Sequence, residues 1–427
     1  MNSLQGKKLL VISSDGSDLE FVKAAHEMGV SVVCCDRYSD WKKSPAKSVA
    51  DGAWDIDYTD TAAVAMKCRE EKIDGVIAGY GEDRVLAACR ISNAIGTPFY
   101  ASEEQIQFTR NKKLFKETCA QCGVSVPKEY CHKLPMSQDD LDKIKYPVIV
   151  KPADNGGRKG ISVCYSSHQL SQAVQIAQEY SATGEIVVEE YLSGLELCAV
   201  YTIVDGEISL SCLNDKYVSQ DGSEMAKLCD FVITPSRYYK TYLREVDPGI
   251  KRLLKHIGAE NGVANFQFIA AGDGIKAFEM GYRINGNNDY TVIAKNNDIN
   301  FMKMLIHHSL TGTMGDSLTK DNPAFKKKYC TYVVHANPGT VQKVEYSKLR
   351  ERQNIYDVFV WKKPGDVILA TGTNAHKSGM IKFVAQDAEE VIDTINFIRE
   401  NLIITDTNGQ NMCMMRLDVA KLAKDLE

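Results

Sequence analysis

The chain has 427 residues, of which 44% are hydrophobic and 25% are charged, a composition typical of a globular protein with about two to four domains. The formal net charge of −5 and the absence of long runs of like charge argue against binding to nucleic acid or to an anionic membrane. No apolar stretch reaches the roughly 18 residues that a membrane span requires, and the first residues turn polar too early for a signal peptide. We therefore expect a cytoplasmic protein.

The first hundred residues alternate short apolar runs with helical patterns. Strands are expected over residues 8–14, 31–36, 74–80 and 97–102. Helices are expected over residues 19–28, 62–71 and 84–94. This rhythm predicts a parallel sheet with helices on both faces. The first turn lacks the GxGxxG pattern, so Asp36 at the end of the second strand is interpreted as an ordinary strand-end acid.

The cysteines fit a reducing compartment. There are 13 of them, an odd number spread mostly through apolar segments, as is typical of free, buried thiols. Cys119 and Cys122 have CxxC spacing, but they lie in a helical pattern that ends at Gly123, and no second ligand pair accompanies them. We interpret this pair as part of a helix.

The rest of the chain mixes helices with antiparallel strand patterns. Helices are expected over 103–123, as one long helix, and over 170–180, 300–311 and 388–401. Strands are expected over 146–151, 161–165 and 185–210, and as a hairpin within 261–290 that turns at Gly272–Gly274. Residues 319–328 are interpreted as a linker, and Tyr329 begins a β-rich segment with one clear helix and a hairpin turn at Asn408–Gly409.

A phosphate site is suggested by the glycine-rich segment 154–160, which follows a strand that ends at Lys151 and whose amides can fold over an anion. Upstream, Lys112 precedes an apolar-periodic helix, although Lys112 and Lys116 could instead form the solvated face of that helix. Further on, two strands carry Gln267 and Glu279, whose oxygens suit a hard cation such as magnesium. An acid within an apolar strand, as at Glu279, calls for a cation or another partner.

This order of elements resembles the ATP-grasp superfamily of carboxylate ligases over most of the chain. The matching segments are, in chain order, Asn111, Lys112 and Lys116 followed by GVSVP, then YPVIVKPADNGGRKGISV, VVEEYLSGLE, and FQF with FEMGYRINGN. The resemblance implies an α/β and α+β chain with three domains. These are a Rossmann-like parallel-sheet domain (1–102), a two-lobed ATP-grasp domain (103–320, with lobes at about 125–192 and 193–320) and a β-rich C-terminal domain (321–427).

The resemblance also implies roles for particular residues. The phosphates of ATP would meet Lys112, Lys151 and the glycines Gly156, Gly157 and Gly160. Glu189 would face the adenine edge, the backbone of Glu190 and Leu192 would read the base, and Glu196 would bind the ribose. Gln267 and Glu279 would hold Mg²⁺ or Mn²⁺, and Arg283 would steady the transferred phosphate as a catalytic cation. Lys216, expected with Asn214 and Asp215 just after the strand ISLSCL, would reach the γ-phosphate as a second catalytic cation. Glu82, in a turn at the carboxyl end of the parallel sheet, and Asn285 would contact the substrate.

One position departs from the family pattern. Two residues after the metal-binding Glu the family usually has Asn, whereas this chain has Gly281, which offers no side-chain oxygen. Asn285, Asn287 or a water would then complete the ligand set, or a second metal ion would be held less tightly. Gln267, where several members have Glu, removes one negative charge as well.

The implied reaction converts a carboxylate into an acyl phosphate with ATP, lets an amine displace the phosphate, and releases ADP and phosphate. The chain would thus be a carboxylate–amine ligase for small molecules such as amino acids or sugar acids, and it could form a homodimer. A bicarbonate-activating carboxylase of the biotin-carboxylase or purine-carboxylase type and a nucleotide-binding protein without turnover are the alternatives. Met302-Lys303-Met304 spells a motif that surrounds biotinylated lysines, but its helical pattern predicts a core helix.

Overall fold

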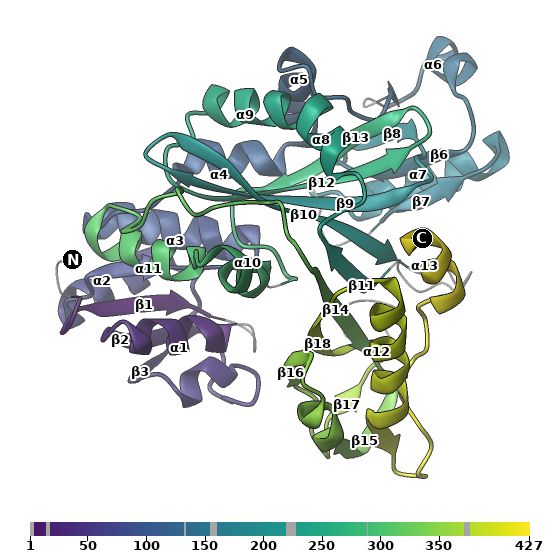
Figure 1. Cartoon of the computed structure of the whole chain (residues 1–427). Coiled ribbons are helices and arrows are strands. Elements are labelled where there is room, and N and C mark those ends of the chain that lie inside the picture. Colours follow the sequence, from purple (N-terminus) through teal and green to yellow (C-terminus); the bar gives the residue numbers. More distant parts are fainter. Residues whose placement is uncertain are drawn as a thin grey trace. The chain divides into compact units, whose positions relative to one another are not determined.

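The computed structural model describes residues 4–13, 18–131, 134–153, 160–218, 228–287, 289–370 and 376–427 (Figure 1). The chain forms two compact units, each built from several segments. The first contains residues 1–193, 199–211 and 241–322, and the second contains residues 194–198, 212–240 and 323–427. The three-domain division expected from the sequence remains a proposal. Among the described residues, no helix is long and apolar enough to cross a membrane.

A four-stranded parallel sheet opens the first unit, as predicted. Its strands are β1 (Lys8–Ile12), β2 (Ser31–Asp36), β3 (Gly52–Asp55) and β4 (Gly75–Ile77), in the order β3-β2-β1-β4. Its helices are α1 (Leu19–Glu27), α2 (Thr61–Glu71) and α3 (Glu82–Ile95), with the 3₁₀ helix η2 (Pro45–Ser48) after β2. Helix α1 lies on the opposite side of β1 from α2 and α3 (Figure 1). The edge strand β3 was not predicted.

The strand expected over residues 97–102 does not form. This segment is an irregular connection before the next helix. The ring of Tyr100 is buried, packs edge-on against Tyr282, and its hydroxyl donates a hydrogen bond to the Tyr282 carbonyl oxygen at 3.0 Å. The apolar run therefore anchors a loop instead of extending the sheet.

The single helix expected over residues 103–123 is two helices, α4 (Glu103–Arg110) and α5 (Lys112–Gln121). Asn111 has extended backbone angles (φ −88°, ψ 92°), and its side-chain oxygen accepts a hydrogen bond from the Leu114 amide at 3.0 Å. An asparagine that caps a following helix competes with continued helix in this way. The break makes Lys112 the first residue of α5.

A small antiparallel sheet follows in the same unit. It consists of β5 (Glu129–Cys131), β6 (Val148–Pro152), β7 (Ser162–Cys164) and β8 (Ile186–Glu190), in the order β5-β8-β6-β7. Helices α6 (Gln138–Lys143) and α7 (Ser167–Glu179) belong to this region. Val148, Val150 and Val188 of the sheet pack with Leu170 of α7 in a buried cluster, so the continuous apolar runs mark strands buried against a helix.

The region 185–210, expected as strand, is divided into β8, β9 (Leu195–Val204) and β10 (Glu207–Val218). Asp205 (φ +48°) and Gly206 (φ +79°) form the turn between β9 and β10. Two successive residues with positive φ are typical of a two-residue hairpin turn. Both β9 and β10 have residues in each of the two units.

The predicted hairpin near residue 270 is β12 (Gly262–Ala271) paired with β13 (Gly274–Gly281), and the strand order continues β13-β12-β9-β10. The helices that follow β11 and β13 along the chain are α8 (Tyr239–Glu245), α9 (Asp247–His256), α10 (Asp289–Asn297) and α11 (Phe301–Thr311). Met302–Met304 lies inside α11, as predicted, and Lys303 forms an ion pair with Glu27 at 2.8 Å.

The second unit is β-rich, as expected. Strands β11 (Cys229–Thr234), β14 (Lys328–His335), β18 (Lys377–Ala385) and β16 (Ile355–Val360) follow β10 in the sheet, and β17 (Val367–Ile368), β15 (Gly339–Glu345) and β19 (Ile403–Asp406) form a second sheet. The helices are η3 (Ser347–Glu351), α12 (Ala388–Asn401) and α13 (Val419–Leu426). Helix α12 and the turn at Gly409 (φ +77°) are confirmed. Helix α13, capped by Asp418, was missed.

All thirteen cysteines are free thiols, and most are buried, as predicted. Cys119 lies in α5 and Cys122 caps its C-terminus. The Cys122 carbonyl oxygen accepts two hydrogen bonds from Arg252, at 3.1 and 2.7 Å. The helical interpretation of the CxxC pair is therefore confirmed.

Candidate functional site

Lys151, Lys116 and Glu189 form a buried ion cluster in the first unit. Lys151 lies on β6, Glu189 on the adjacent β8, and Lys116 on α5. Their exposed fractions are 6%, 2% and 6%, and each lysine ammonium hydrogen-bonds a different carboxylate oxygen of Glu189. Lys116 also lies 2.9 Å from Oε2 of Glu129. Lys116 is therefore not part of a solvated face, and that interpretation was wrong for this residue.

The electrostatics of the cluster favour an ionised carboxylate. Burial raises the pKa of Glu189, but Lys151 and Lys116 lower it by more, so the pKa lies below its usual value. Burial lowers the pKa of Lys116, but Glu189 and Glu129 raise it by more. Glu189 and Lys116 are thus charged near neutral pH, and the hydrogen bond from Lys151 to Glu189 holds the Lys151 ammonium in place. The sequence patterns pointed to Lys116 only as a motif residue.

Lys112 approaches the same end of β6. Its Nζ donates a hydrogen bond to the carbonyl oxygen of Pro152 at 3.4 Å, next to Lys151. Gly156 and Gly157, predicted to cradle phosphate, lie outside the described residues. Gly160 has φ +70°, and a Cβ there would lie 2.6 Å from Cβ of Tyr180. Position 160 therefore requires glycine both for its backbone conformation and for the close approach of Tyr180.

Glu190 is tied to two neighbouring segments. Its Oε1 accepts hydrogen bonds from the Lys128 amide at 2.8 Å and from Nζ of Lys276 at 2.7 Å, and Lys276 also pairs with Asp273 at 2.6 Å. Leu192 follows β8 and is half-buried. The adenine contacts assigned to Glu189, Glu190 and Leu192 remain predictions.

Gln267 and Glu279 face each other across the β12–β13 hairpin. They are directly paired in the register, and Nε2 of Gln267 donates to Oε2 of Glu279 at 3.1 Å. Within the described parts of the chain, no group of three or more His, Cys, Asp or Glu side chains could hold a metal ion. One carboxylate and one amide are a small ligand set, which fits a magnesium ion bound largely through nucleotide phosphates and water.

Arg283, just after β13, contacts Glu82 at the start of α3. Its Nε and Nη2 lie 2.7 and 2.5 Å from Oε1 of Glu82, and Nη1 donates to the Ile284 carbonyl oxygen at 2.9 Å. From the sequence, Arg283 was expected at the phosphate and Glu82 at the substrate, and the structure brings these two residues together. Asn285 is buried and donates to Asp289 at 2.6 Å.

In the second unit, Lys216 pairs with Glu196. Nζ of Lys216 lies 3.2 Å from Oε2 of Glu196. The prediction that Asn214, Asp215 and Lys216 follow a strand was wrong, because β10 continues to Val218. Pairing with β11, in which Asp215 is opposite Ile233 and Lys216 opposite Val232, extends the strand through these polar residues.

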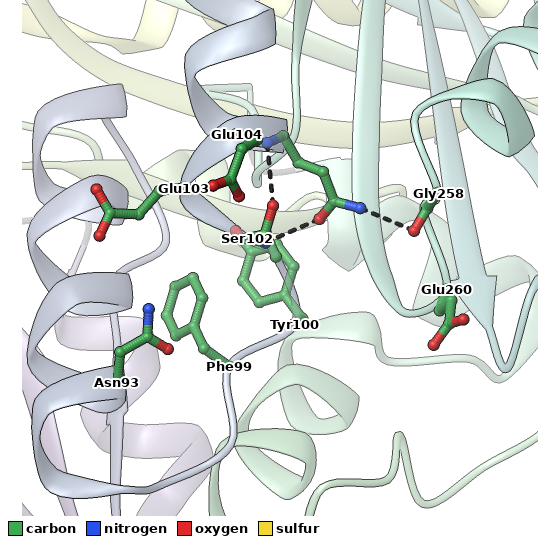
Figure 2. A pocket seen from close by; sticks show the side chains of 10 residues that line it. Asn93, Phe99, Tyr100, Ser102, Glu103, Glu104, Gly258 and Glu260 are labelled. Atoms are coloured by element: carbon green, nitrogen blue, oxygen red, sulfur yellow. Dashed lines mark hydrogen bonds between the residues drawn. The ribbon is translucent and has the colours of Figure 1, made fainter.

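None of the predicted site residues lines a surface pocket of about 620 Å³, which is shown in Figure 2. Its lining comes from Asn93, from residues 99–105, and from Gly258 and Glu260. Nε2 of Gln105 donates to the Gly258 carbonyl oxygen at 2.7 Å, and the backbone amide of Gln105 donates to Oγ of Ser102 at 3.2 Å (Figure 2). The pocket therefore borders the N-terminal cap of α4.

Comparison with known proteins adds sequence relatives. Residues 124–221 match the family model described as D-ala D-ala ligase C-terminus. The carbamoyl phosphate synthase large chain of Archaeoglobus fulgidus is 26% identical over 244 residues, which cover 55% of this chain and 22% of that one. The formate-dependent phosphoribosylglycinamide formyltransferase of Methanocaldococcus jannaschii is 27% identical over 194 residues, which cover 44% and 48%. The chain thus matches less than half the length of each relative.

Solved structures show the same fold over nearly the whole chain. L-amino acid ligase from Bacillus licheniformis has a TM-score of 0.77 at 19% identity and covers 95% of this chain and 100% of its own. The biotin carboxylase domain dimer of 2-oxoglutarate carboxylase from Hydrogenobacter thermophilus, solved with MgADP and bicarbonate, has a TM-score of 0.77 at 18% identity. It covers 93% of this chain and 90% of its own.

Proposed function

Because the chain belongs to the ATP-grasp superfamily, we propose that it is an ATP-dependent ligase that joins a carboxylate to an amine. ATP phosphorylates the carboxylate, the amine displaces phosphate from the acyl phosphate, and ADP and phosphate are released. The observation that carries this proposal is the hydrogen bond from Lys112 to the carbonyl oxygen of Pro152, the residue that follows Lys151 at the end of β6. Two cations from separate elements thus lie at the end of the strand that comes just before the glycine-rich segment in the sequence, as a site for a polyphosphate requires.

The cations lower the cost of bringing an anionic nucleotide to an anionic carboxylate. Two unit charges 4 Å apart interact by about 4 kcal/mol at an effective dielectric constant of 20. Lys112 and Lys151 bind phosphate oxygens, with the amides of Gly156, Gly157 and Gly160, and Glu189 keeps Lys151 oriented. Arg283 contacts the phosphoryl group in transfer with its planar set of donors. Lys216 is proposed as a further cation for the γ-phosphate.

The remaining site residues have proposed roles around the nucleotide and the substrate. Glu190 and Leu192 read adenine through their backbone, and Glu196 binds the ribose hydroxyls. Gln267 and Glu279 would hold Mg²⁺ or Mn²⁺, which neutralises charge on the phosphates when bound. Glu82 and Asn285 contact the substrate, and Glu82 also pairs with Arg283. The proposal includes a cytoplasmic location and a homodimer.

A carboxylase that activates bicarbonate is the second candidate. The similarity to a biotin carboxylase domain bound to MgADP and bicarbonate favours it. Bicarbonate is itself a carboxylate-like anion, so the same cations would serve either reaction. The two candidates differ in the anion that stimulates turnover of ATP. A protein that binds nucleotide without turnover would form no ADP with any anion.

The test is a screen for ADP release with ATP, Mg²⁺ and amines in the presence of amino acids, sugar acids, formate or bicarbonate. Stimulation by an organic carboxylate that depends on an amine supports the ligase, and stimulation by bicarbonate supports the carboxylase instead. Lys151→Ala and Glu279→Ala should abolish the stimulated rate. Gln105→Ala, which changes an amide beside the surface pocket, should retain it. Full activity in both site variants would mean that the site is misassigned.

A further inference from the structure

The face of the β12–β13 hairpin that carries Gln267 and Glu279 also carries Asn265 and Gly281. Asn265 lies opposite Gly281, just as Gln267 lies opposite Glu279, and residues two apart on a strand share one face. The four residues therefore form two neighbouring cross-strand pairs. An amide side chain is absent at 281, but one is present directly across the ladder at 265.

The Asn265 side chain occupies the space beside Gly281. It is buried, and its Nδ2 donates hydrogen bonds to the carbonyl oxygens of Gly281 at 3.2 Å and Arg283 at 2.8 Å. A Cβ at position 281 would lie 3.1 Å from this Nδ2 and 3.4 Å from Cγ of Arg283. A side chain at position 281 would thus crowd the Asn265 amide and require it to shift by a few tenths of an ångström.

These hydrogen bonds hold the chain where β13 ends. The intervening carbonyl, that of Tyr282, accepts the hydroxyl of Tyr100 at 3.0 Å. Three successive carbonyl groups, at 281, 282 and 283, are therefore fixed by side chains from two other segments. Beyond the last ladder pair, backbone groups need such partners to remain in one conformation. The fixed backbone and the contact with Glu82 together set the position of the Arg283 guanidinium.

We propose that Asn265 is a positioning residue for Arg283. In this chain Asn265 of β12 supplies a side-chain amide at this place in the hairpin, and position 281 of β13, directly opposite, is therefore a glycine. This inference rests on the proposed function, in which Arg283 contacts the transferred phosphoryl group. A displacement of about 1 Å in such a group can cost about a hundredfold in rate. The Asn265 amide thus serves the reaction without touching the substrate.

The first test compares Asn265→Ala with wild type by hydrogen exchange and by kinetics. Amide exchange over residues 282–285 should become faster, and kcat for ADP formation should fall about 10- to 100-fold. KM for ATP should change little, because the nucleotide contacts remain. Gln105→Ala is the matched control, since its amide also donates to two carbonyl oxygens, at 3.0 and 2.7 Å. It should leave exchange at 282–285 and kcat as in wild type.

The second test moves the amide between strands. Gly281→Asn alone should crowd Asn265 and lower kcat. The double variant Asn265→Ala/Gly281→Asn should have a higher kcat than the two single effects together would give. If Asn265→Ala does not fold, Gly281→Ala, which adds only the crowding Cβ, replaces it and should speed exchange over 282–285.

The outcomes separate this inference from the proposed function. Unchanged exchange at 282–285 in Asn265→Ala, or faster exchange with unchanged kcat, overturns the positioning role. If the effects of the two substitutions on kcat are independent in the double variant, the idea that an amide on β13 can replace the one on β12 is overturned. If Asn265→Ala speeds exchange at 282–285 while the wild-type protein forms no ADP with any carboxylate, the role of Asn265 in holding the backbone is supported and the ligase function is rejected.

Discussion

Glu82 and Arg283, 201 residues apart in the chain, form an ion pair in which Nε of Arg283 lies 2.7 Å from Oε1 of Glu82. The pair joins the first turn of α3 to the end of β13. Its side chains are 34% and 22% exposed, so both remain accessible to a small anion. An anionic substrate that binds Arg283 must therefore compete with Glu82 or share the guanidinium with it.

Glu82→Gln should lower kcat/KM for the stimulating carboxylate about tenfold, which corresponds to about 1.4 kcal/mol of transition-state stabilisation. The change keeps the shape of the side chain but removes the charge that orients Arg283. Thermal stability should change by less than about 1 kcal/mol, because the pair is partly exposed. Asp83→Asn, which affects a neighbouring pair with Arg110 at 2.6 Å, is the control and should leave kcat/KM unchanged. Equal effects of the two variants would contradict a special role for Glu82.

Glu189→Gln should destabilise the protein by about 3–5 kcal/mol, since it leaves Lys116 and Lys151 buried without their shared carboxylate. The pKa of Glu189 is lower in the folded protein than in the unfolded chain. Its contribution to the free energy of unfolding is therefore complete above the unfolded pKa and is lost as the pH falls through the folded pKa. Urea unfolding near neutral pH measures the loss. Glu129→Gln should cost less, since Lys116 keeps Glu189. A larger loss in Glu129→Gln would contradict the cluster as described.

Gln267→Glu should make stability depend on divalent cations. The new carboxylate would face Glu279 across the hairpin, where Gln267 now donates a hydrogen bond at 3.1 Å. Two like charges at this distance repel, and a divalent cation relieves the repulsion. The melting temperature of the variant should be lower than that of wild type without metal and should rise more on addition of Mg²⁺. Identical shifts in both proteins would show that this face does not bind the ion.

Asp215→Asn should alter the acid dependence of stability. Burial raises the pKa of Asp215 from 3.8 to about 6, and its Oδ1 has no hydrogen-bond partner among the described residues. The folded protein therefore holds this proton more tightly than the unfolded chain. Between about pH 4 and pH 6, Asp215 makes the free energy of unfolding decrease as the pH rises, by about 3 kcal/mol in all. The variant should lack this decrease, and thermal unfolding across that range would measure it. Parallel curves would exclude the shifted carboxyl.

Local signals were sufficient for much of the fold. The parallel sheet, the β12–β13 hairpin and helix α12 each have a clear period of apolar residues or a glycine turn, and these were predicted from sequence. The edge strand β3 has only four residues, which is too short for a clear alternation. Helix α13, in contrast, has apolar residues at helical spacing (Val419, Leu422 and Leu426), and this signal was overlooked. The break at Asn111 depends on one capping side chain within an otherwise helical pattern. A four-residue strand and a break set by one capping residue carry little periodic signal.

The candidate site shows the same limit more strongly. Lys151, Gln267 and Glu279 are conspicuous because polar residues interrupt apolar strands. Lys116 is not, because its partner Glu189 lies 73 residues away and only folding brings them together. The role inferred for Asn265 likewise depends on the register of β12 with β13, which pairs it with Gly281 and not with any sequence neighbour. Ion pairs and cross-strand contacts of this kind are properties of the folded chain.

The division of β9 and β10 between the two units restricts how the protein can be dissected. Each unit is assembled from three separate segments of the chain, so no single contiguous fragment encodes either of them. A fragment that stops after Asn322 would retain β11 but lose β14, with which β11 pairs from Phe231 to Thr234. Such a fragment would expose an unpaired strand edge, which promotes aggregation. Studies of the separate units therefore require circular permutation or engineered connections rather than simple truncation.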